Sequence, residues 1–539
     1  MQHIYHNGKI ITMSESSTDN AMRLAPEAVL TEDGIIKAAG TMSDITAMAG
    51  KDAVRTDLDG RCLMPSFIDP HGHIFLNGRF SSCCYLGECK SHRDIINTLR
   101  TFIRERAPGN GSAVIGYGYD HNFLEEQTHP DRRILDQVST DLPILVLHVS
   151  LHTASANSMA LDAGNINENT KDPEGGFIGR FKNSREPSGY LEETAAHILR
   201  NIFLKYDESD LSSVAKGMQA NYLKNGITTA QDGATDPTVL KGLKEIARSG
   251  KLQLDIVSYP MMSKGGVEML HVNQDLCGKY KNRLRIGGYK IILDGSPQAR
   301  SAWMSKPYQG GEEDYCGYPW HTDSEVLDFV STALSEGRQV LAHCNGDAAG
   351  DQYLDAYEKA LANTGAKGDL RPVMVHCQTA RNDQLDRMAK LGMVATIFVG
   401  HVYYWGDVHV KNFGPERGSR VSPVNDALKR GITYTLHQDT PVTPPYMMHS
   451  IWCAVNRITR GGNHIGPEEK VGVYDALKGI TINAAYQYFE EHEKGTISPG
   501  KRADLVVLDR SPLEVRPEDL KDIRVCSTIK DGQTVYGGE

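Results

Sequence analysis

The chain has 539 residues, of which 40% are hydrophobic and 23% are charged, the profile of a globular protein with ample material for a core. The 58 basic and 68 acidic residues give a net charge of −10, which argues against nucleic acid or an anionic membrane as the main partner. No stretch approaches the roughly 20 apolar residues of a membrane span, and the N-terminus lacks a signal core. The ten cysteines are scattered without a CxxC pair, so we expect free thiols and a cytoplasmic location.

Both ends of the chain are rich in short apolar runs separated by tight-turn signals. Asn-Gly at 7–8 and Asp-Gly at 33–34 lie between such runs near the N-terminus, and Asp-Gly at 531–532 does so near the C-terminus. These dipeptides are typical of β-hairpins. We expect residues 1–62 and 490–539 to form one small β-sandwich domain; the alternative is two unrelated tails.

The middle of the chain repeats a different unit, a helix followed by a glycine and a buried strand. Leu211, Val214 and Met218 fall on one helical stripe, after which come Gly226 and an apolar run at 227–231. Repetition of this unit indicates a parallel sheet. Eight strands are expected at 64–71, 227–232, 252–259, 284–293, 339–343, 372–376, 393–399 and 432–437.

Eight parallel strands predict an α/β fold of the (β/α)8 barrel type, which we place at residues 63–489. Residues from about 76 to 210 do not follow the repeat, because they carry a polar, glycine-rich stretch at 165–188 and strands of their own. We interpret this segment as an insertion after the first barrel strand, on the catalytic face.

The predicted strands end in residues that bind metals. His71 and His73 follow the first strand, and strand side chains alternate, so both imidazoles point the same way. Strand C-termini of a parallel barrel meet at one rim, and the further candidates on other strands are Lys290, His343, His376 and Asp439. Four histidines and a carboxylate predict a site for one or two divalent ions, most readily Zn²⁺, although a coincidental surface pair of histidines is the simpler alternative for the first strand alone.

At this point the sequence resembles a known family. Residues 64–73 (MPSFIDPHGH) are similar to the opening motif of the amidohydrolase superfamily. Five further segments resemble, more narrowly, the branch called amidohydrolase family 3, or YtcJ-like. They are 293–296 (LDGS), 342–349 (AHCNGDAA), 375–378 (VHCQ), 437–442 (HQDTPV) and 495–504 (GTISPGKRAD). The departures are small: Ser66 replaces a usual glycine, and Cys344 and Cys377 stand where alanine is commoner.

The resemblance implies a role for each candidate ligand. It implies that His71, His73 and Asp439 hold a more buried ion and that His343 and His376 hold a second. Lys290 falls where many members carry a carboxylated lysine that bridges both ions, and a buried amine with a depressed pKa can capture CO2. The alternative is an ordinary lysine paired with Asp294, in which case the site holds one metal.

The implied chemistry is attack of a metal-activated hydroxide on a substrate carbonyl, with Asp439 as the proton shuttle to the leaving nitrogen. His152 resembles a residue that hydrogen-bonds the carbonyl oxygen, against a capping or core role. Further candidates for substrate binding, each set against a structural role, are Tyr119, Asp120, Arg300, His401 and Tyr404.

We therefore expect a metal-dependent hydrolase of carbon–nitrogen bonds in small non-peptide amides, of the N-acyl or N-formyl amine type, with a homodimer as the prior for its assembly. A deaminase, a cyclic-amide hydrolase and a metal-dependent isomerase or lyase on the same scaffold remain open. A non-catalytic binding or regulatory protein is the rival from another class, and the complete set of ligands argues against it.

Overall fold

The structure is a computed structural model, and it describes residues 1–14, 25–106, 113–173, 176–204, 211–310 and 313–537. The chain divides into two compact units. The first comprises Met1–Phe75 and Met218–Glu539, and the second is Leu76–Gly217. Among the described residues, no helix is both long and apolar enough to cross a membrane.

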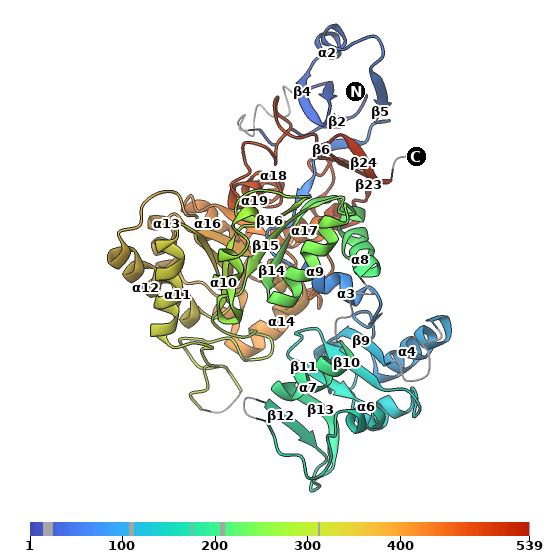
Figure 1. Cartoon of the computed structure of the whole chain (residues 1–539), viewed down its shortest axis with the longest axis vertical. Helices are drawn as coiled ribbons and strands as arrows, with labels where there is room; N and C mark the ends of the chain where they lie inside the picture. The colour runs from blue at the N-terminus through green and yellow to red at the C-terminus, as the bar shows by residue number, and fades with distance from the viewer. Residues whose placement is uncertain (15–24, 107–112, 174–175, 205–210, 311–312, 538–539) are drawn as a thin grey trace. The chain divides into compact units, whose positions relative to one another are not determined.

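Strands from the two ends of the chain form two sheets in the first unit (Figure 1). One has the order β4-β3-β1-β5, with β1 Gln2–His6, β3 Ala28–Glu32, β4 Ile35–Gly40 and β5 Val54–Asp57, and the helix α2 Met42–Met48 follows β4. The other has the order β2-β6-β22-β23-β24, with β2 Lys9–Ile10, β6 Cys62–Pro65, β22 Leu505–Leu508, β23 Val525–Lys530 and β24 Gln533–Gly537. Val29, Leu63 and Val507 belong to one hydrophobic cluster that draws on both sheets. The expected association of the two ends is therefore present, whereas an independent terminal domain stays a prediction because these strands belong to the larger unit.

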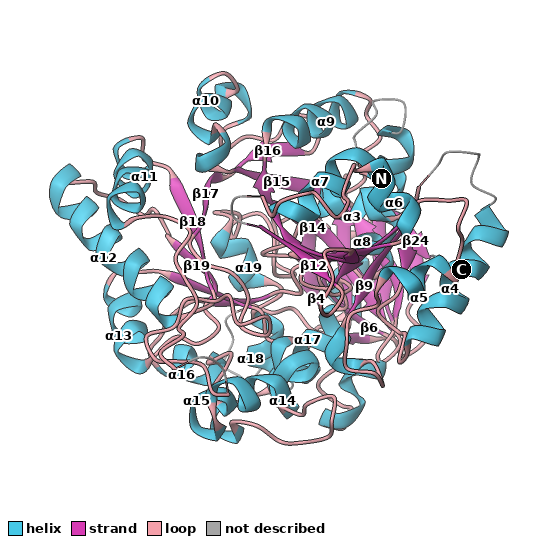
Figure 2. Ribbon diagram, turned by 90° about the horizontal axis from the view of Figure 1, so that it is seen from below, coloured by secondary structure: helices cyan, strands magenta, loops and turns pink. Residues whose placement is uncertain are grey.

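Parallel strands form two further sheets in the same unit (Figure 2). The order β16-β15-β14-β7 contains β7 Phe67–Ile68, β14 Ile227–Thr235, β15 Asp255–Pro260 and β16 Leu284–Ile286. The order β17-β18-β19-β20-β21 contains β17 Gly288–Ile292, β18 Gln339–Cys344, β19 Val373–His376, β20 Val394–Ile397 and β21 Tyr434–Leu436. All their pairings are parallel, and each expected strand overlaps an observed one. The expected strand at 284–293 is interrupted at Gly287, which divides it into β16 and β17.

Helices follow the parallel strands. Those of the repeat are α8 Leu211–Lys224, α9 Pro237–Arg248, α10 Gly266–His271, α11 Asp323–Ser335, α12 Asp347–Thr364, α13 Asn382–Lys390, α14 His401–Phe413, α15 Pro415–Ser419 and α16 Val424–Lys429. The closing helices are α17 Met447–Asn456, α18 Val473–Lys478 and α19 Ile482–Gln487. In α9 the Asp236 side chain accepts from Val239 N at the N-cap, Pro237 takes the first turn, and Leu243 lies on the buried stripe.

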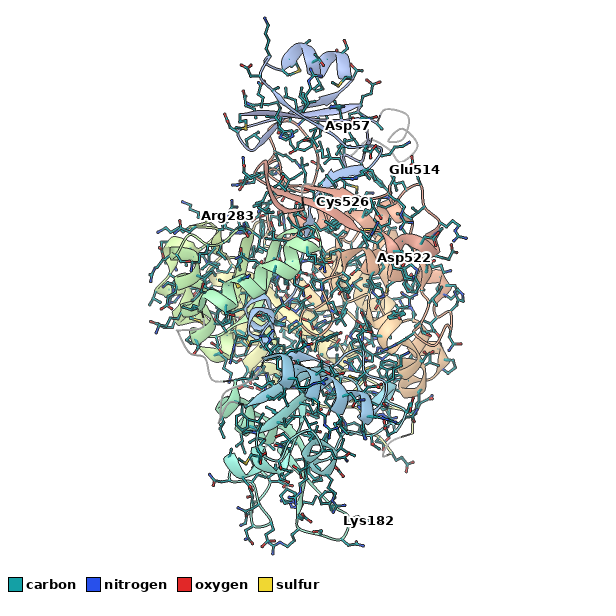
Figure 3. The ribbon with its side chains drawn as sticks, turned by 90° about the vertical axis from the view of Figure 1, so that its right-hand side faces the viewer. Asp57, Lys182, Arg283, Glu514, Asp522 and Cys526 are labelled. Carbon is teal, nitrogen blue, oxygen red and sulfur yellow. The ribbon has the colours of Figure 1, made fainter. Side chains whose placement is uncertain are left out.

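The amino ends of the parallel strands connect to the terminal strands through charged groups. Arg283, labelled in Figure 3, lies just before β16 and contacts Asp255 at the start of β15 at 3.2 Å and Asp531 after β23 at 2.9 Å. At the other edge, Ile68 N donates to Ile480 O and Leu436 N donates to Gly479 O. Residues 479–480 thus contact both β7 and β21, the outermost strands of the two sheets.

The second unit contains a six-stranded sheet of order β12-β13-β11-β10-β9-β8. Its strands are β8 Cys84–Tyr85, β9 Val114–Tyr119, β10 Ile144–His148, β11 Thr153–Ala156, β12 Gly176–Arg180 and β13 Pro187–Glu193. Its helices are α4 His92–Arg106, α5 Arg132–Asp136, α6 Ser158–Ala163, α7 Thr194–Phe203 and the short η1 His121–Phe123, and α3 Ile74–Phe80 precedes it. It lies in the chain between β7 and β14, which pair with each other, so it is an insertion into the parallel repeat.

Candidate metal centre

The candidate ligands of the first unit come from the carboxyl ends of the parallel strands. His71 and His73 follow β7, His376 is the last residue of β19, and Asp439 lies just beyond β21. His376 and Asp439 adopt left-handed backbone conformations, with φ of +70° and +53°. Such conformations are uncommon for residues with a side chain and concentrate at functional sites.

Three of the candidates converge within metal-binding reach of one another. One ligand atom each of His71, His376 and Asp439 lies within 4.8 Å of the other two, and all three residues are buried. Asp439 Oδ1 is 3.3 Å from Nε2 of His71 and 3.3 Å from Nε2 of His73. The His343 ring lies next to that of His376, with a centroid separation of 4.5 Å.

Two of the imidazoles are fixed by partners on the side away from the cluster. His71 Nδ1 lies 2.6 Å from Gln231 Oε1; the amide nitrogen of Gln231 donates to Pro70 O, so the oxygen is the acceptor and His71 Nδ1 the donor. His343 Nδ1 is 3.0 Å from Asp294 Oδ1. In His71 this leaves Nε2 as the ligating nitrogen, the arrangement that outer partners impose at metal sites, whereas His343 Nε2 lies 3.3 Å from the Asn345 side-chain amide nitrogen.

Gly233 lets the His71 ring take this position. A Cβ at residue 233 would stand 2.6 Å from the His71 ring carbon Cε1, closer than side chains approach one another. Any residue with a side chain at position 233 would therefore displace the His71 imidazole.

His437 belongs to the same cluster, and the sequence reasoning gave it no role. Its ring centroid is 5.1 Å from that of His71 and 5.2 Å from that of His376. It is completely buried, and neither ring nitrogen has a hydrogen-bond partner among the described residues. Its position directly after a buried strand, two residues before Asp439, was the signal that could have identified it.

Lys290 lies within β17 and is buried. Its Nζ has no hydrogen-bond partner in the described part of the chain. The alternative pairing with Asp294 is not seen, because that carboxylate accepts instead from His343 Nδ1 and from the backbone N–H groups of residues 303, 345 and 346. Burial lowers the pKa of Lys290 to about 8, an effect that the nearby Asp439 opposes.

The protonation states suit metal binding. Burial lowers the pKa of His71 and of His376 well below the usual value, so both rings are neutral near pH 7. Burial would raise the pKa of Asp439, but contact with His73 and the other imidazoles holds it well below its usual range. The cluster therefore presents neutral nitrogen donors and an anionic oxygen, the forms in which these groups ligate.

Buried polar atoms without partners test whether a cation fits. Lys290 Nζ, His376 Nδ1 and Asp439 Oδ1 are all in this state. An unpaired buried polar group costs about 1–3 kcal/mol, and one divalent ion would satisfy the imidazole nitrogen of His376 and the carboxylate oxygen of Asp439 at once. The donor set of His71, His376 and Asp439 fits Zn²⁺, which prefers imidazole nitrogen and carboxylate oxygen.

The other candidates of the first unit, those for substrate binding, lie among aromatic side chains or beside a loop. His401 is buried, its Nδ1 is 2.9 Å from His409 Nε2, and its ring packs on Phe398, which also packs on His437. Tyr404 is half-buried beside Tyr403 and His449. The Arg300 guanidinium donates to Asn412 Oδ1 and to the carbonyl oxygens of residues 309 and 310. Arg300 therefore braces a loop, which is the structural alternative to its expected role with a substrate anion.

The candidates of the second unit are held by their own neighbours. His152 Nδ1 lies 3.1 Å from Glu193 Oε1. Tyr119 is a core residue whose hydroxyl contacts His129 Nδ1 at 2.9 Å, and Asp120 accepts from Asn122 N as the N-cap of η1. Contact of His152, Tyr119 and Asp120 with a substrate stays a prediction.

Comparison with known proteins identifies the family. A model of the amidohydrolase family matches residues 56–536. The chain belongs to the amidohydrolase family. It is 29% identical over 540 residues to an N-substituted formamide deformylase of Arthrobacter pascens, covering 96% of each chain. It is 27% identical over 548 residues to YtcJ of Bacillus subtilis (strain 168), an amidohydrolase by name, covering 99% of each.

A solved structure agrees. The crystal structure of an uncharacterized metal-dependent hydrolase from Pyrococcus horikoshii OT3 is similar with a TM-score of 0.75 and 25% identity, over 96% of this chain and 99% of the other. The fold is thus the TIM-barrel type of α/β fold of this family, as the sequence predicted. The chain is an enzyme, a metal-dependent amidohydrolase, and this confirms the resemblance on which the prediction relied.

Proposed function

We propose that this amidohydrolase cleaves the carbon–nitrogen bond of small non-peptide amides, of the N-formyl or N-acyl amine type. Asp439 carries this proposal, because its Oδ1 faces two histidines at 3.3 Å and has no hydrogen-bond donor within the described residues. The relative from Arthrobacter pascens, an N-substituted formamide deformylase that aligns over 96% of both chains, supports the substrate class.

We propose that the metal is Zn²⁺. One ion is held by His71, His73 and Asp439, and a second ion is held by His343 and His376. A bound divalent ion supplies Lewis-acid polarisation of the amide carbonyl and lowers the pKa of the attacking water. Asp439 is anionic near neutral pH, so it accepts the proton of that water at Oδ1. It then returns the proton to the leaving nitrogen, which must depart as an amine.

Lys290 is assigned as a carboxylated ligand. With a pKa of about 8, a fraction of its amine is neutral at pH 7 and can react with CO2. The carbamate would place an anionic oxygen where the structure has an unpartnered Nζ. The hydrogen bonds of residues 479 and 480 to β21 and β7 support closure of the two parallel sheets into one eight-stranded barrel, which would bring all these proposed ligands to one rim.

A substrate screen on the zinc-loaded full chain tests the proposal. The library pairs each N-formyl amine with its N-acetyl analogue and with a cyclic amide and an amino-heterocycle of similar size. We expect release of amine and carboxylic acid from the acyclic amides, lost when the ions are removed by chelation and regained with Zn²⁺. Ammonia release from the heterocycle alone, or turnover that survives complete metal removal, would overturn it.

A further inference from the structure

The second unit carries its own group of histidine and carboxylate side chains. β9 and β10 are parallel neighbours (Figure 1). After a register shift that follows Leu147, His148 at the end of β10 pairs with Tyr119 at the end of β9. Asp120 and His121 follow β9 directly. Two parallel strands that end together therefore place Asp120, His121 and His148 at one edge of the sheet, with every member inside residues 120–148.

The separations of the three donor atoms match those around a small metal ion. His121 Nδ1 is 3.2 Å from His148 Nε2, and Asp120 Oδ1 is 3.5 Å from His148 Nε2 and 3.8 Å from His121 Nδ1. A point equidistant from three atoms with these separations lies about 2.0 Å from each, within the range of Zn–N and Zn–O bonds. Without a cation, the contact between His121 and His148 is a hydrogen bond in which one ring N–H donates to the other ring.

Neighbouring groups hold each donor in place. The Asn122 backbone N–H and side-chain amide both donate to Asp120 Oδ1 at 2.9 Å and orient the carboxylate. The His129 ring stacks on that of His121 with a centroid separation of 4.1 Å. Partners of this kind hold ligands at metal sites.

Burial distinguishes a binding face. Asp120 and His148 are buried, whereas the side chain of His121 is 29% exposed. Three protein donors with access on one side leave room for a fourth ligand, the pattern of an open rather than a closed site.

We propose that Asp120, His121 and His148 bind a divalent cation of the Zn²⁺ class, separately from the ligands at the ends of the parallel strands. Two imidazoles and one carboxylate suit Zn²⁺ better than Ca²⁺ or Mg²⁺, which take oxygen ligands. The fourth position is taken by water or by a donor atom of a small ligand.

Ser150 sets the protonation of His148. Its backbone N–H lies 3.1 Å and its Oγ 2.9 Å from His148 Nδ1. When Nε2 ligates, the ring proton resides on Nδ1 and is donated to Ser150 Oγ. Without metal, Nδ1 accepts from the Ser150 N–H instead. Ser150→Ala should therefore weaken metal binding about 10- to 100-fold.

Zinc content of the full chain tests the proposal. Each variant is purified, stripped with chelator, equilibrated with Zn²⁺, dialysed and measured by elemental analysis. We expect the double variant His121→Ala/His148→Ala to hold one ion fewer than wild type. His92→Gln is the matched control, because His92 lies in the same unit but its ring contacts Thr128 O at 2.9 Å and Glu126 Oε1 at 4.0 Å; it should keep the full zinc content.

A second background removes the contribution of the other centre. His71→Asn/His376→Asn should retain about one ion per chain, which adding His121→Ala/His148→Ala abolishes, with circular dichroism confirming that each protein is folded. In the retained site, X-ray absorption should report two imidazole nitrogens at about 2.0 Å. Equal zinc content in wild type and folded His121→Ala/His148→Ala would overturn the proposal, as would a first shell without imidazole.

Discussion

The two ends of the parallel strands in the first unit treat buried charge in opposite ways. At the carboxyl ends, Lys290 Nζ and Asp439 Oδ1 are buried without hydrogen-bond partners among the described residues. At the amino ends, Lys530 Nζ contacts Asp255 at 2.6 Å and Asp504 at 2.7 Å. Lys494 Nζ joins them, 2.8 Å from Asp255.

Lys290 and Lys530 allow a direct comparison of the two ends, because each is only 1% exposed. Burial lowers the pKa of Lys290 to about 8, whereas Asp504 and Asp255 overcome burial and raise the pKa of Lys530. The same type of side chain therefore loses its proton more easily at one end and is a stable cation at the other. In folds of this type the first end serves the chemistry and the second serves stability.

Replacing each lysine with methionine should give the largest difference between the two ends. Lys530→Met leaves Asp255 and Asp504 without that cation and should destabilise the chain by about 3–5 kcal/mol. Lys290→Met removes an unpaired amine, so it should change stability little or raise it, while most bound metal is lost. Urea denaturation of chelator-treated proteins measures the first effect and elemental analysis of zinc-loaded proteins the second. Equal destabilisation by both substitutions would show that the two ends do not differ as the contacts indicate.

Asp439→Asn against Asp255→Asn separates turnover from folding. Asparagine keeps the shape of Asp439 but cannot accept a proton, so activity should fall about 100-fold or more, on the order of 3 kcal/mol in the barrier, in a folded protein. Asp255→Asn should lower the denaturation midpoint and leave the turnover of the folded fraction within a few-fold of wild type. Rates across a series of leaving amines sharpen the test, because poor leaving amines should suffer most. A flat ratio across the series would assign the proton to another group.

Lowering the pH should give the smallest of these effects. The loss of stability should come from the charged groups at the amino ends of the parallel strands. Burial would raise the pKa of Asp255, but Lys494 and Lys530 hold it well below its usual range. The stability that this carboxylate contributes is therefore present above its unfolded pKa of about 3.9 and is lost as the pH falls. Between about pH 5 and pH 3 the loss should be roughly 1–1.5 kcal/mol. Denaturation midpoints across this window should fall less steeply for Asp255→Asn than for wild type; parallel slopes would contradict the assignment.

The sequence determined the repeat of the first unit and most of its candidate ligands. Helix, glycine and apolar run are local patterns, so each expected strand overlaps an observed one, although the strand expected at 64–71 divides between β6 of the terminal sheet and β7 of the parallel sheet. His71, His376 and Asp439 could be selected because each lies at or just beyond a strand end, and parallel strand ends converge. The association of the chain ends was also predictable, since both ends carry short apolar strands separated by tight-turn signals, although the pairing of β6 with β22 was not predicted.

Only the tertiary structure decided which polar groups satisfy one another. Asp294 was the alternative partner for Lys290, yet it orients His343. His437 had no assigned role, and its ring lies next to those of His71 and His376. Arg300 was a candidate for an anion and is engaged by loop oxygens instead. The Asp120, His121 and His148 group likewise required the register of β9 and β10. Hydrogen bonding and ligation require that atoms of residues far apart in sequence be placed to within a few tenths of an ångström. Composition and periodicity do not specify positions to that precision.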